Sequence, residues 1–286
     1  EKDAPFGLKP ELLNEILKEK LAIISNKPQT TRNRILGIRN TEQSQMIFID
    51  TPGIHKPKHR LNEIMVKTAV DTLKEVDVVA FLVEAGDSVG VGDRYIIDTF
   101  LNDVRVPVVL IINKIDLVKK ENLLPLIGEY NRIRKFAEII PVSALKGDNV
   151  EHLLNVLEGY LPEGPKYYPD DIYTDQPERF IAAEIVREKI INRTKEEIPY
   201  SVAVAIEEFK ERENGNVYIS CLIYVERDSQ KGIIIGRAGR MLKDIGTEAR
   251  EGIERLLGAK VFLELSVKVK KDWRSDNRVL KELGYE

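Results

Sequence analysis

The sequence has little of the chemistry that builds disulfide frameworks and metal clusters. Its 286 residues include one cysteine, Cys221, and three histidines, His55, His59 and His152. A single cysteine excludes an internal disulfide and a cysteine-based metal cluster, and the histidines form no HExxH pair. We therefore expect a protein of a reducing compartment without a structural metal, with Cys221 as a small core residue.

Long apolar runs are also missing. No stretch approaches the roughly 20 residues that a membrane-crossing helix needs, and no signal peptide is recognisable, so we expect a cytosolic location. With 43% hydrophobic and 32% charged residues, the chain can bury sizeable cores and stay soluble. The length suits about two domains of ~150 residues. Because the net charge is −3, any nucleic-acid binding must come from a local basic patch.

The first half of the chain has the pattern of a doubly wound α/β domain. Short apolar, β-branched runs are separated by stretches long enough for crossover helices. Several of these runs do not alternate, which is typical of parallel strands buried on both faces. The predicted strands are 45–50, 77–84, 106–116 and 138–143, and the predicted helices are 60–75, 93–101, 123–136 and 149–161.

A proline-rich segment follows, and the pattern changes after it. We interpret residues 162–178 as an interdomain linker, because they contain four prolines. The part beyond the linker reads as a smaller α+β domain. Its predicted elements are a helix at 179–193, strands at 201–210 and 217–226 around a hairpin turn at 213–216, a helix at 239–257 and a last strand at 261–269.

Three motifs follow predicted strands, at the edge where open parallel sheets bind their ligands. The first, Asp50-Thr51-Pro52-Gly53, follows the apolar strand residues 45–49. An aspartate there can hold Mg²⁺ through water, and the Gly53 amide can approach a terminal phosphate because no side chain obstructs it. On its own, this motif is also compatible with an ordinary turn.

The other two motifs suit a guanine base. The motif Asn113-Lys114-Ile115-Asp116 follows the apolar strand residues 106–112. Its Asp116 can accept both hydrogens that guanine offers at N1 and N2, and the stem of Lys114 can lie along the purine face. After the next strand, a backbone amide of Ser143-Ala144-Leu145-Lys146 can meet the guanine oxygen. Each motif alone also occurs in polar loops, but their order and their common position at strand ends favour a guanine-nucleotide site.

With these motifs the chain resembles the Era family of guanine-nucleotide-binding proteins, from about Leu12 to the C-terminus. The resemblance implies a P-loop-NTPase-like GTPase domain at 1–161 and an RNA-binding type II KH domain at 179–286. It implies GTP or GDP as ligand and Mg²⁺ as cofactor. The implied nucleotide-site residues are Lys9, Asp50, Thr51, Pro52, Gly53, Asn113, Lys114, Asp116, Ser143, Ala144 and Leu145, with Asp50, Thr51, Gly53 and Ile54 in the catalytic role.

Switch I and the water-positioning residue follow from the same resemblance. Residues Pro28 to Arg32 fit the switch I element of the family, where either Thr30 or Thr31 binds Mg²⁺ together with Asp50. Ile54 occupies the place of the glutamine that orients water in Ras-like enzymes. An apolar residue is similar to the family pattern there, and it cannot orient water by hydrogen bonding.

The phosphate-binding loop departs from the GxxxxGK[ST] pattern. Aligned on Leu12-Leu13-Asn14, Lys9 takes the place of the phosphate lysine, but Pro10 and Glu11 replace the hydroxyl residues. Pro10 lacks an amide hydrogen and a Mg²⁺-ligating hydroxyl, and Glu11 brings negative charge toward phosphates. Either the sequence lacks or misstates its true start, or the domain is a nucleotide-defective pseudo-GTPase. The other motifs are intact, which favours the first alternative.

The second domain carries a GxxG loop before its long helix. In KH domains such a loop clamps about four nucleotides, and the following helix N-terminus favours phosphate. Between 227 and 243 there are five basic residues and one acidic residue, Asp228. Trp273 either stacks a base or packs a domain end. The predicted RNA-binding residues are Arg227, Lys231, Gly236, Arg237, Ala238, Gly239, Arg240 and Lys243.

The resemblance implies a GTP-hydrolysing assembly factor of the small ribosomal subunit. Its KH domain would bind single-stranded RNA at the 3′ region of 16S rRNA, and the protein would be a cytoplasmic monomer. Peripheral association with the inner membrane is a further property of the family, although the sequence has no recognisable membrane-binding helix. The alternative, from another class, is an RNA-binding KH protein whose first domain is a nucleotide-defective scaffold.

Overall fold

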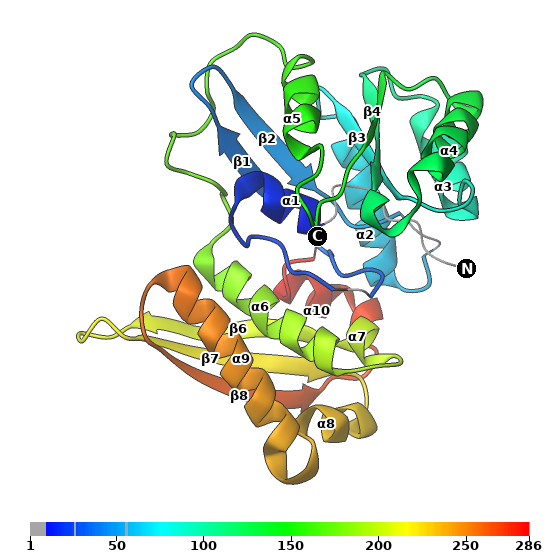
Figure 1. Ribbon diagram of the computed structural model, residues 1–286. Coiled ribbons are helices and arrows are strands. Elements are labelled where there is room, and N and C mark those ends of the chain that lie inside the picture. Colours follow the sequence, from blue (N-terminus) through cyan, green and yellow to red (C-terminus); the bar gives the residue numbers. More distant parts are fainter. Residues whose placement is uncertain (1–9, 26, 55–56, 286) are drawn as a thin grey trace. The chain divides into compact units, whose positions relative to one another are not determined.

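The computed structural model describes residues 10–25, 27–54 and 57–285, and they form two compact units (Figure 1). The first unit contains residues 31–58 and 62–175 together with the chain up to Ala22. The second unit contains residues 176–286 and two short segments, 23–30 and 59–61. The boundary after Asp175 lies within the proline-rich segment, and the domain bounds drawn from the sequence stay predictions.

The first unit contains a parallel sheet covered by helices. Its strands β3 (Val79–Glu84), β4 (Val108–Asn113) and β5 (Glu138–Pro141) pair in that order, and every residue of the central strand β4 is buried. The continuous apolar run predicted a strand that is buried on both faces, and the structure confirms this prediction. The helices of this unit are α1 (Pro10–Leu17), α2 (Arg60–Thr72), α3 (Val91–Ile96) with a π-helical turn (Ile97–Leu101), α4 (Lys120–Ile133) and α5 (Val150–Glu158).

A hairpin stands beside this parallel sheet, and the sequence pattern did not anticipate it. Strand β2 (Gln45–Asp50) pairs antiparallel with β1 (Ile35–Asn40), with Ile35 opposite Asp50. Its residues alternate between half-buried and buried, as expected for a strand covered on one face. The hairpin positions Asp50 at the end of β2, and Gly37 lets β1 approach α1 closely, because a Cβ there would lie 2.7 Å from Leu17 Cδ1.

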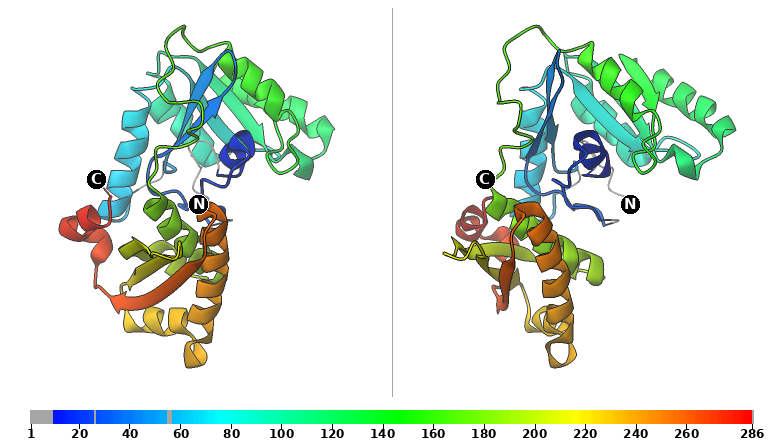
Figure 2. Two further views of the ribbon diagram at one scale, coloured as in Figure 1. Left: turned by 90° about the vertical axis from the view of Figure 1, so that its left-hand side faces the viewer. Right: turned by 60° about the vertical axis from the view of Figure 1, so that its left-hand side comes forward.

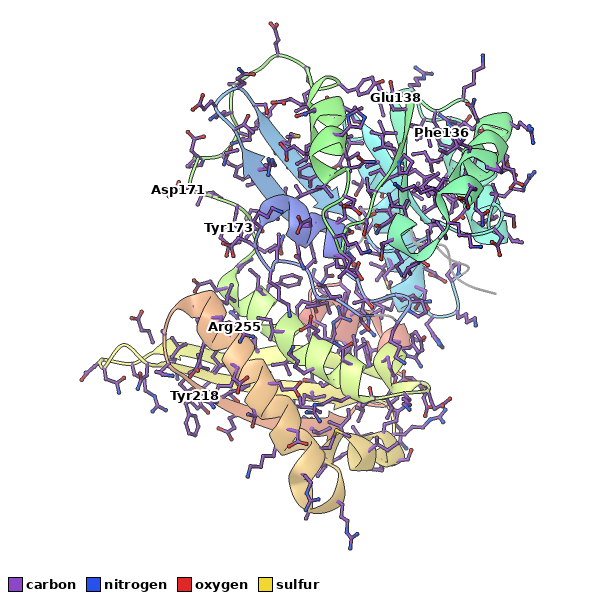
Figure 3. All side chains as sticks on the ribbon, viewed as in Figure 1. Phe136, Glu138, Asp171, Tyr173, Tyr218 and Arg255 are labelled. Atoms are coloured by element: carbon purple, nitrogen blue, oxygen red, sulfur yellow. The ribbon has the colours of Figure 1, made fainter. Side chains whose placement is uncertain are left out.

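The proline-rich segment is anchored on this hairpin. The amides of Tyr167 and Tyr168 donate to Gln45 Oε1 at 2.8 and 3.0 Å. Tyr173 lies farther along this segment (Figure 3). Its carbonyl accepts a hydrogen bond from the Ile38 amide at 2.8 Å. The segment therefore runs along the first unit before the chain enters the second unit, and these partners satisfy three of its backbone polar groups.

The second unit is a three-stranded sheet with helices. Strand β7 (Val217–Val225) is central, antiparallel to β6 (Ala203–Glu211) and parallel to β8 (Val261–Val269). Helices α6 (Glu178–Arg193) and α9 (Arg240–Leu257) pack on one face of this sheet (Figures 1 and 2). The remaining helices are α7 (Ile198–Ser201), α8 (Asp228–Ile235) and α10 (Asn277–Glu282). Apart from the short helices α7, α8 and α10, this is the order of helix, two strands, helix and strand that the sequence predicted.

The structure decides between the two roles that the sequence left open for Trp273, stacking on a base or packing the end of the domain. Its side chain is fully buried, and its Nε1 donates to the Ser201 carbonyl at 2.9 Å. Its ring stacks on Tyr285 with a centroid distance of 6.4 Å. Trp273 therefore packs the end of the domain, and it presents no face on which a base could stack.

Candidate functional site

Two loops at the carboxyl ends of β4 and β5 are joined by side-chain hydrogen bonds. Asn113 is buried, and its Oδ1 accepts from the Lys114 amide at 2.7 Å and from the Ala144 amide at 3.0 Å. Asp116 Oδ1 accepts from Ser143 Oγ at 2.6 Å. The structure thus brings together residues from two motifs that lie about 30 positions apart in the sequence.

The Asp116 carboxylate is available as a hydrogen-bond acceptor. The hydrogen bond from Ser143 lowers its pKa below the usual aspartate value, so the group is ionised at neutral pH. Lys114 adopts left-handed backbone geometry (φ 64°) and its Nζ pairs with Glu84 at 2.7 Å. Leu145 is exposed at the rim of the same loop. An ionised carboxylate beside a lysine stem suits a base that presents two adjacent N–H donors, as guanine does.

Asp50 lies at the end of β2 in a buried position. It is 1% exposed, and its Oδ2 accepts from Thr31 Oγ1 at 3.1 Å. Burial raises the pKa of Asp50 well above its usual value, the hydrogen bonds from Thr31 and Thr51 lower it, and the negative charge of Glu11 raises it further. A hydroxyl and a carboxylate at one place are oxygen ligands of the kind that Mg²⁺ prefers, and a bound cation would favour the ionised carboxylate.

The structure distinguishes between the two switch I threonines. Thr30 Oγ1 donates to the carbonyl of Lys27 at 2.7 Å, within its own turn. Thr31 Oγ1 is the hydroxyl that reaches Asp50. The geometry therefore favours Thr31 over Thr30 as the partner of Asp50 at a metal, which the sequence alone left open.

The residues after Asp50 run into the core. Thr51 and Pro52 are buried and Gly53 is half-buried. Ile54 is 2% exposed and belongs to the hydrophobic cluster that includes Phe81 and Leu110. Its side chain has no polar atom with which to orient water, and it packs among apolar groups.

The expected phosphate loop falls mostly outside the described residues. Lys9 and the residues before it belong to this undescribed part. Helix α1 begins at Pro10, a position where a helix tolerates proline because no intrahelical hydrogen bond is lost. Asn14 then fixes the exit of the helix, since its Oδ1 accepts from the Leu21 and Ala22 amides at 3.0 and 2.9 Å. The Asp116 carboxylate suits a guanine base, and the oxygens of Thr31 and Asp50 suit Mg²⁺. Pro10 and Glu11 do not suit a phosphate.

The GxxG loop of the second unit has a backbone that needs glycine. Gly236 has φ 72° and ψ 175°, and a Cβ there would lie 2.5 Å from Met241 Cβ. Gly239 has φ 75° and ψ 7°, and a Cβ there would have no neighbour within 4 Å among the described residues. Between them, Ala238 is also left-handed (φ 52°), and α9 begins at Arg240. The backbone of this loop is therefore open to a close-approaching ligand.

The basic residues predicted around this loop lie at the surface. Arg227, Arg237, Arg240 and Lys243 are exposed, and Lys231 is half-buried. Gln230 is buried and fixes the start of α8, because its Oε1 accepts from the Glu226 and Arg227 amides. Arg274, farther along the chain, is taken up by an ion pair with Glu226 at 2.6 Å.

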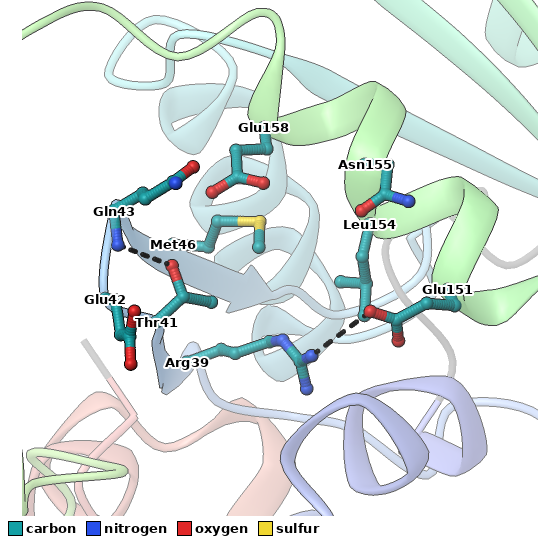
Figure 4. Close-up of a pocket in the computed structure, with 9 residues that line it drawn as sticks. All are labelled: Arg39, Thr41, Glu42, Gln43, Met46, Glu151, Leu154, Asn155 and Glu158. Atoms are coloured by element: carbon teal, nitrogen blue, oxygen red, sulfur yellow. Dashed lines mark hydrogen bonds and ion pairs between the residues drawn. The ribbon is translucent and has the colours of Figure 1, made fainter.

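Another hollow lies away from these residues. It has a volume of about 290 Å³ between the β1–β2 hairpin and α5 (Figure 4). Its lining includes Arg39 and the acidic side chains of Glu42, Glu151 and Glu158. None of the predicted site residues lines it, and an acidic hollow of this kind does not suit an anionic nucleotide.

Clustered metal ligands and membrane-spanning helices are both absent from the described residues. Among residues 10–25, 27–54 and 57–285, no three histidine, cysteine or acidic side chains converge as a metal site. A magnesium ion held by one carboxylate, one hydroxyl and water needs no such cluster. Every helix in the described part of the chain is too short or too polar to span a bilayer.

Comparisons with known proteins cover both units. A family model described as a 50S ribosome-binding GTPase matches residues 9–114, and a KH domain model matches residues 197–274. A crystal structure of Era with MgGDPNP and nucleotides 1506–1542 of 16S ribosomal RNA is 43% identical over 98% of this chain and 95% of that chain, with a TM-score of 0.95. A variant of Era from Aquifex aeolicus, bound to GDP and AlF₄⁻, is 43% identical over 96% of this chain and 94% of that chain, with a TM-score of 0.93. The chain therefore belongs to the Era family, as its motifs indicated.

Proposed function

We propose that this protein is a GTP-hydrolysing assembly factor of the small ribosomal subunit that binds the 3′ region of 16S rRNA through its KH domain. The observation that carries the proposal is the joined pair of loops at β4 and β5, in which Asn113 bonds Ala144 and Asp116 bonds Ser143. Family membership adds to it, because the Era relative was crystallised with a GTP analogue, magnesium and this part of the RNA.

The residues divide the work of GTP hydrolysis, in which water and GTP give GDP and phosphate. Asp116 selects guanine through its carboxylate, and Asn113 and Ser143 hold the two loops in register. Thr31 and Asp50 hold Mg²⁺, which supplies charge neutralisation on the phosphates. Gly53 offers its amide to the terminal phosphate. Ile54 excludes solvent and orients no water, so catalysis here rests on positioning and electrostatics.

The KH domain supplies the RNA contact. The GxxG backbone admits phosphates because residues 236 and 239 have no side chain, and the basic residues around it neutralise them. Arg237, Arg240 and Lys243 are exposed at this end of α9. The binding is therefore local, in a chain whose overall net charge is −3.

A second candidate function is favoured by one observation. Glu11 acts on Asp50 electrostatically, so a negative charge lies near the predicted metal site, and Pro10 brings no hydroxyl there. A domain with this loop would serve as a scaffold for the KH domain and would hydrolyse no GTP.

A titration with a fluorescent GTP analogue, followed by phosphate release with and without Mg²⁺, separates the two functions. The GTPase proposal expects saturable binding and Mg²⁺-dependent phosphate release that Asp50→Ala abolishes. A matched variant, Asp170→Ala in the exposed part of the linker, should keep both. If the folded parent neither binds the analogue nor releases phosphate, the scaffold function replaces the GTPase.

Family membership supports four further proposals. The protein acts on the small subunit, it is a monomer, it resides in the cytoplasm, and it associates peripherally with the inner membrane. Sedimentation with small subunits, size-exclusion chromatography with light scattering, cell fractionation, and sedimentation with vesicles of anionic lipid test these in turn. A dimer, or a sediment without the protein, would remove the corresponding proposal.

A further inference from the structure

Glu84 joins the end of β3 to the loop that carries Lys114. It is the last residue of β3, and it lies opposite Asn113, the last residue of β4, in the parallel pairing of these strands (Figure 1). The pairing continues by one hydrogen bond, because the Ala85 amide donates to the Asn113 carbonyl at 2.8 Å. Lys114 follows directly, and its Nζ lies 2.7 Å from Glu84 Oε1. All of these residues belong to the first unit.

The side chain of Lys114 is held at both of its ends. At the backbone end, the Lys114 amide donates to Asn113 Oδ1 at 2.7 Å, and the backbone is left-handed with φ 64° and ψ 35°. The same Asn113 oxygen accepts from the Ala144 amide, so this end is fixed to both base loops. At the far end, Glu84 fixes the ammonium group. Ordering a free lysine side chain costs rotamer entropy, and the ion pair imposes part of that cost before a nucleotide arrives.

This ion pair contributes little to the stability of the fold. The side chain of Lys114 is 37% exposed and that of Glu84 is 46% exposed, so water and salt screen the attraction between them. The charge of Glu84 is also negative, and by itself it repels an anionic ligand such as a nucleotide. A carboxylate at this place therefore favours nucleotide binding only through the lysine that it holds.

We propose that Glu84 is a positioning residue that holds the stem of Lys114 along the purine face of a bound guanine nucleotide. The inference rests on the proposed GTPase function and extends it to a residue outside the three motifs. Because GTP and GDP carry the same base, the effect of Glu84 falls equally on both nucleotides. Because Glu84 acts through Lys114, its effect disappears when residue 114 has no ammonium group.

The test uses the full chain with Glu84→Gln, which keeps the size of the side chain and removes its charge. Lys114→Met keeps an unbranched stem and removes the ammonium group, and the double variant completes a double-mutant cycle. The matched control is Asp71→Asn on α2, which breaks another exposed ion pair of the first unit, between Asp71 and Lys74 at 2.9 Å. Melting curves establish that each variant is folded.

The first readout is the dissociation rate of fluorescent GDP and of a fluorescent, non-hydrolysable GTP analogue, measured by stopped flow. Glu84→Gln should raise both rates by the same factor of about two to five, which is the range of an exposed ion pair. In the Lys114→Met background the same substitution should change neither rate. At about 1 M salt, where charges are screened beyond about 3 Å, the rates of the parent and of Glu84→Gln should converge.

A role of Glu84 as a mere negative charge predicts the opposite sign. Removing a charge that repels the nucleotide, or that withdraws Lys114 from it, would slow dissociation. A folded Glu84→Gln variant that releases both nucleotides as slowly as Asp71→Asn, or more slowly, therefore overturns the proposal. An equal acceleration with and without the Lys114→Met substitution overturns it as well, because Glu84 would then act by another route.

The second readout needs no nucleotide. Nuclear magnetic relaxation of the Lys114 methylene groups reports how ordered the stem is in the free protein. The order should fall in Glu84→Gln and stay unchanged in Asp71→Asn. If the parent binds neither nucleotide, the proposed function fails, and this relaxation alone decides whether Glu84 positions the stem. Unchanged order in Glu84→Gln then refutes the positioning role.

Discussion

The two glycines of the GxxG loop have different steric surroundings, which predicts different costs for the same substitution. At Gly236, alanine meets two penalties. Its backbone (φ 72°, ψ 175°) lies in a region that only glycine populates readily, which costs about 1–3 kcal/mol. The new Cβ would also lie 2.5 Å from Met241 Cβ and 3.0 Å from the Met241 amide nitrogen, and overpacking of this kind costs about 1–3 kcal/mol.

At Gly239 only the first kind of penalty applies. Its backbone (φ 75°, ψ 7°) is near the left-handed helical region, where alanine costs about 1 kcal/mol. In the described part of the chain, no heavy atom lies within 4 Å of the added Cβ. We therefore expect Gly236→Ala to destabilise the second unit by about 2–6 kcal/mol and Gly239→Ala by about 1 kcal/mol.

Thermal unfolding followed by circular dichroism checks the difference. One kcal/mol moves the midpoint of a domain of this size by about 4–8 °C, so the two variants should differ by roughly 5 °C or more. RNA affinity should fall further in Gly236→Ala, because relieving the contact with Met241 moves the start of α9 with its arginines. Equal midpoints for the two variants would refute the steric argument.

Three further predictions concern the first unit. Asp116→Asn should weaken the binding of GTP by about 10- to 100-fold. It should strengthen the binding of xanthosine triphosphate, whose base has an oxygen in place of the guanine amine. Competition titration with both nucleotides checks this, and unchanged affinities would remove Asp116 from the base site. Burial raises the pKa of Asp50, so the folded protein without Mg²⁺ binds an extra proton above the ordinary aspartate pKa, and its stability should fall as pH rises through the raised value. Asp50→Asn should flatten that slope in melting curves between about pH 4 and 8 and abolish Mg²⁺-dependent hydrolysis, whereas a slope equal to that of the parent would show that another group causes it. Ile54→Ala should cost about 2–4 kcal/mol of stability but reduce hydrolysis only modestly, whereas Asp50→Ala should remove it, so equal losses of activity would contradict this division of roles.

The elements with strong periodicity could be predicted from the sequence. A local pattern of side chains is enough to identify such elements, whatever the rest of the chain does. Examples are the apolar run at 108–113, the amphipathic helix before Gly258 and the order of elements in the second domain. Two of the three nucleotide motifs could be found for a related reason. Parallel strands end at a common edge, so residues after β4 and β5 must lie close together.

Features that depend on one long-range contact could not be predicted. Thr30 and Thr31 are chemically identical neighbours, and only the turn that directs Thr30 to Lys27 separates them. In the sequence, Arg187 is one charged residue of an amphipathic helix. Nothing in the neighbouring sequence predicts its hydrogen bond to the Thr30 carbonyl, which lies 157 positions earlier in the chain. β1 was missed because its run contains Gly37 and two polar residues at its end, a composition that alone favours a loop.

RNA binding by the KH domain is tested most directly by replacing Arg237 and Ala238 together with aspartate. Aspartate tolerates the left-handed backbone of Ala238 better than most residues, so the loop should keep its fold. The measurement is a fluorescence titration with single-stranded RNA of the 16S 3′ end at two salt concentrations, with GTP analogue and Mg²⁺ present and circular dichroism as the folding control. We predict a steep loss of affinity and a salt slope reduced by about one unit, because one arginine contact is lost and two negative charges face phosphate. A folded double variant that binds this RNA like the parent, with the same salt slope, would contradict the assignment of the GxxG loop as the RNA site.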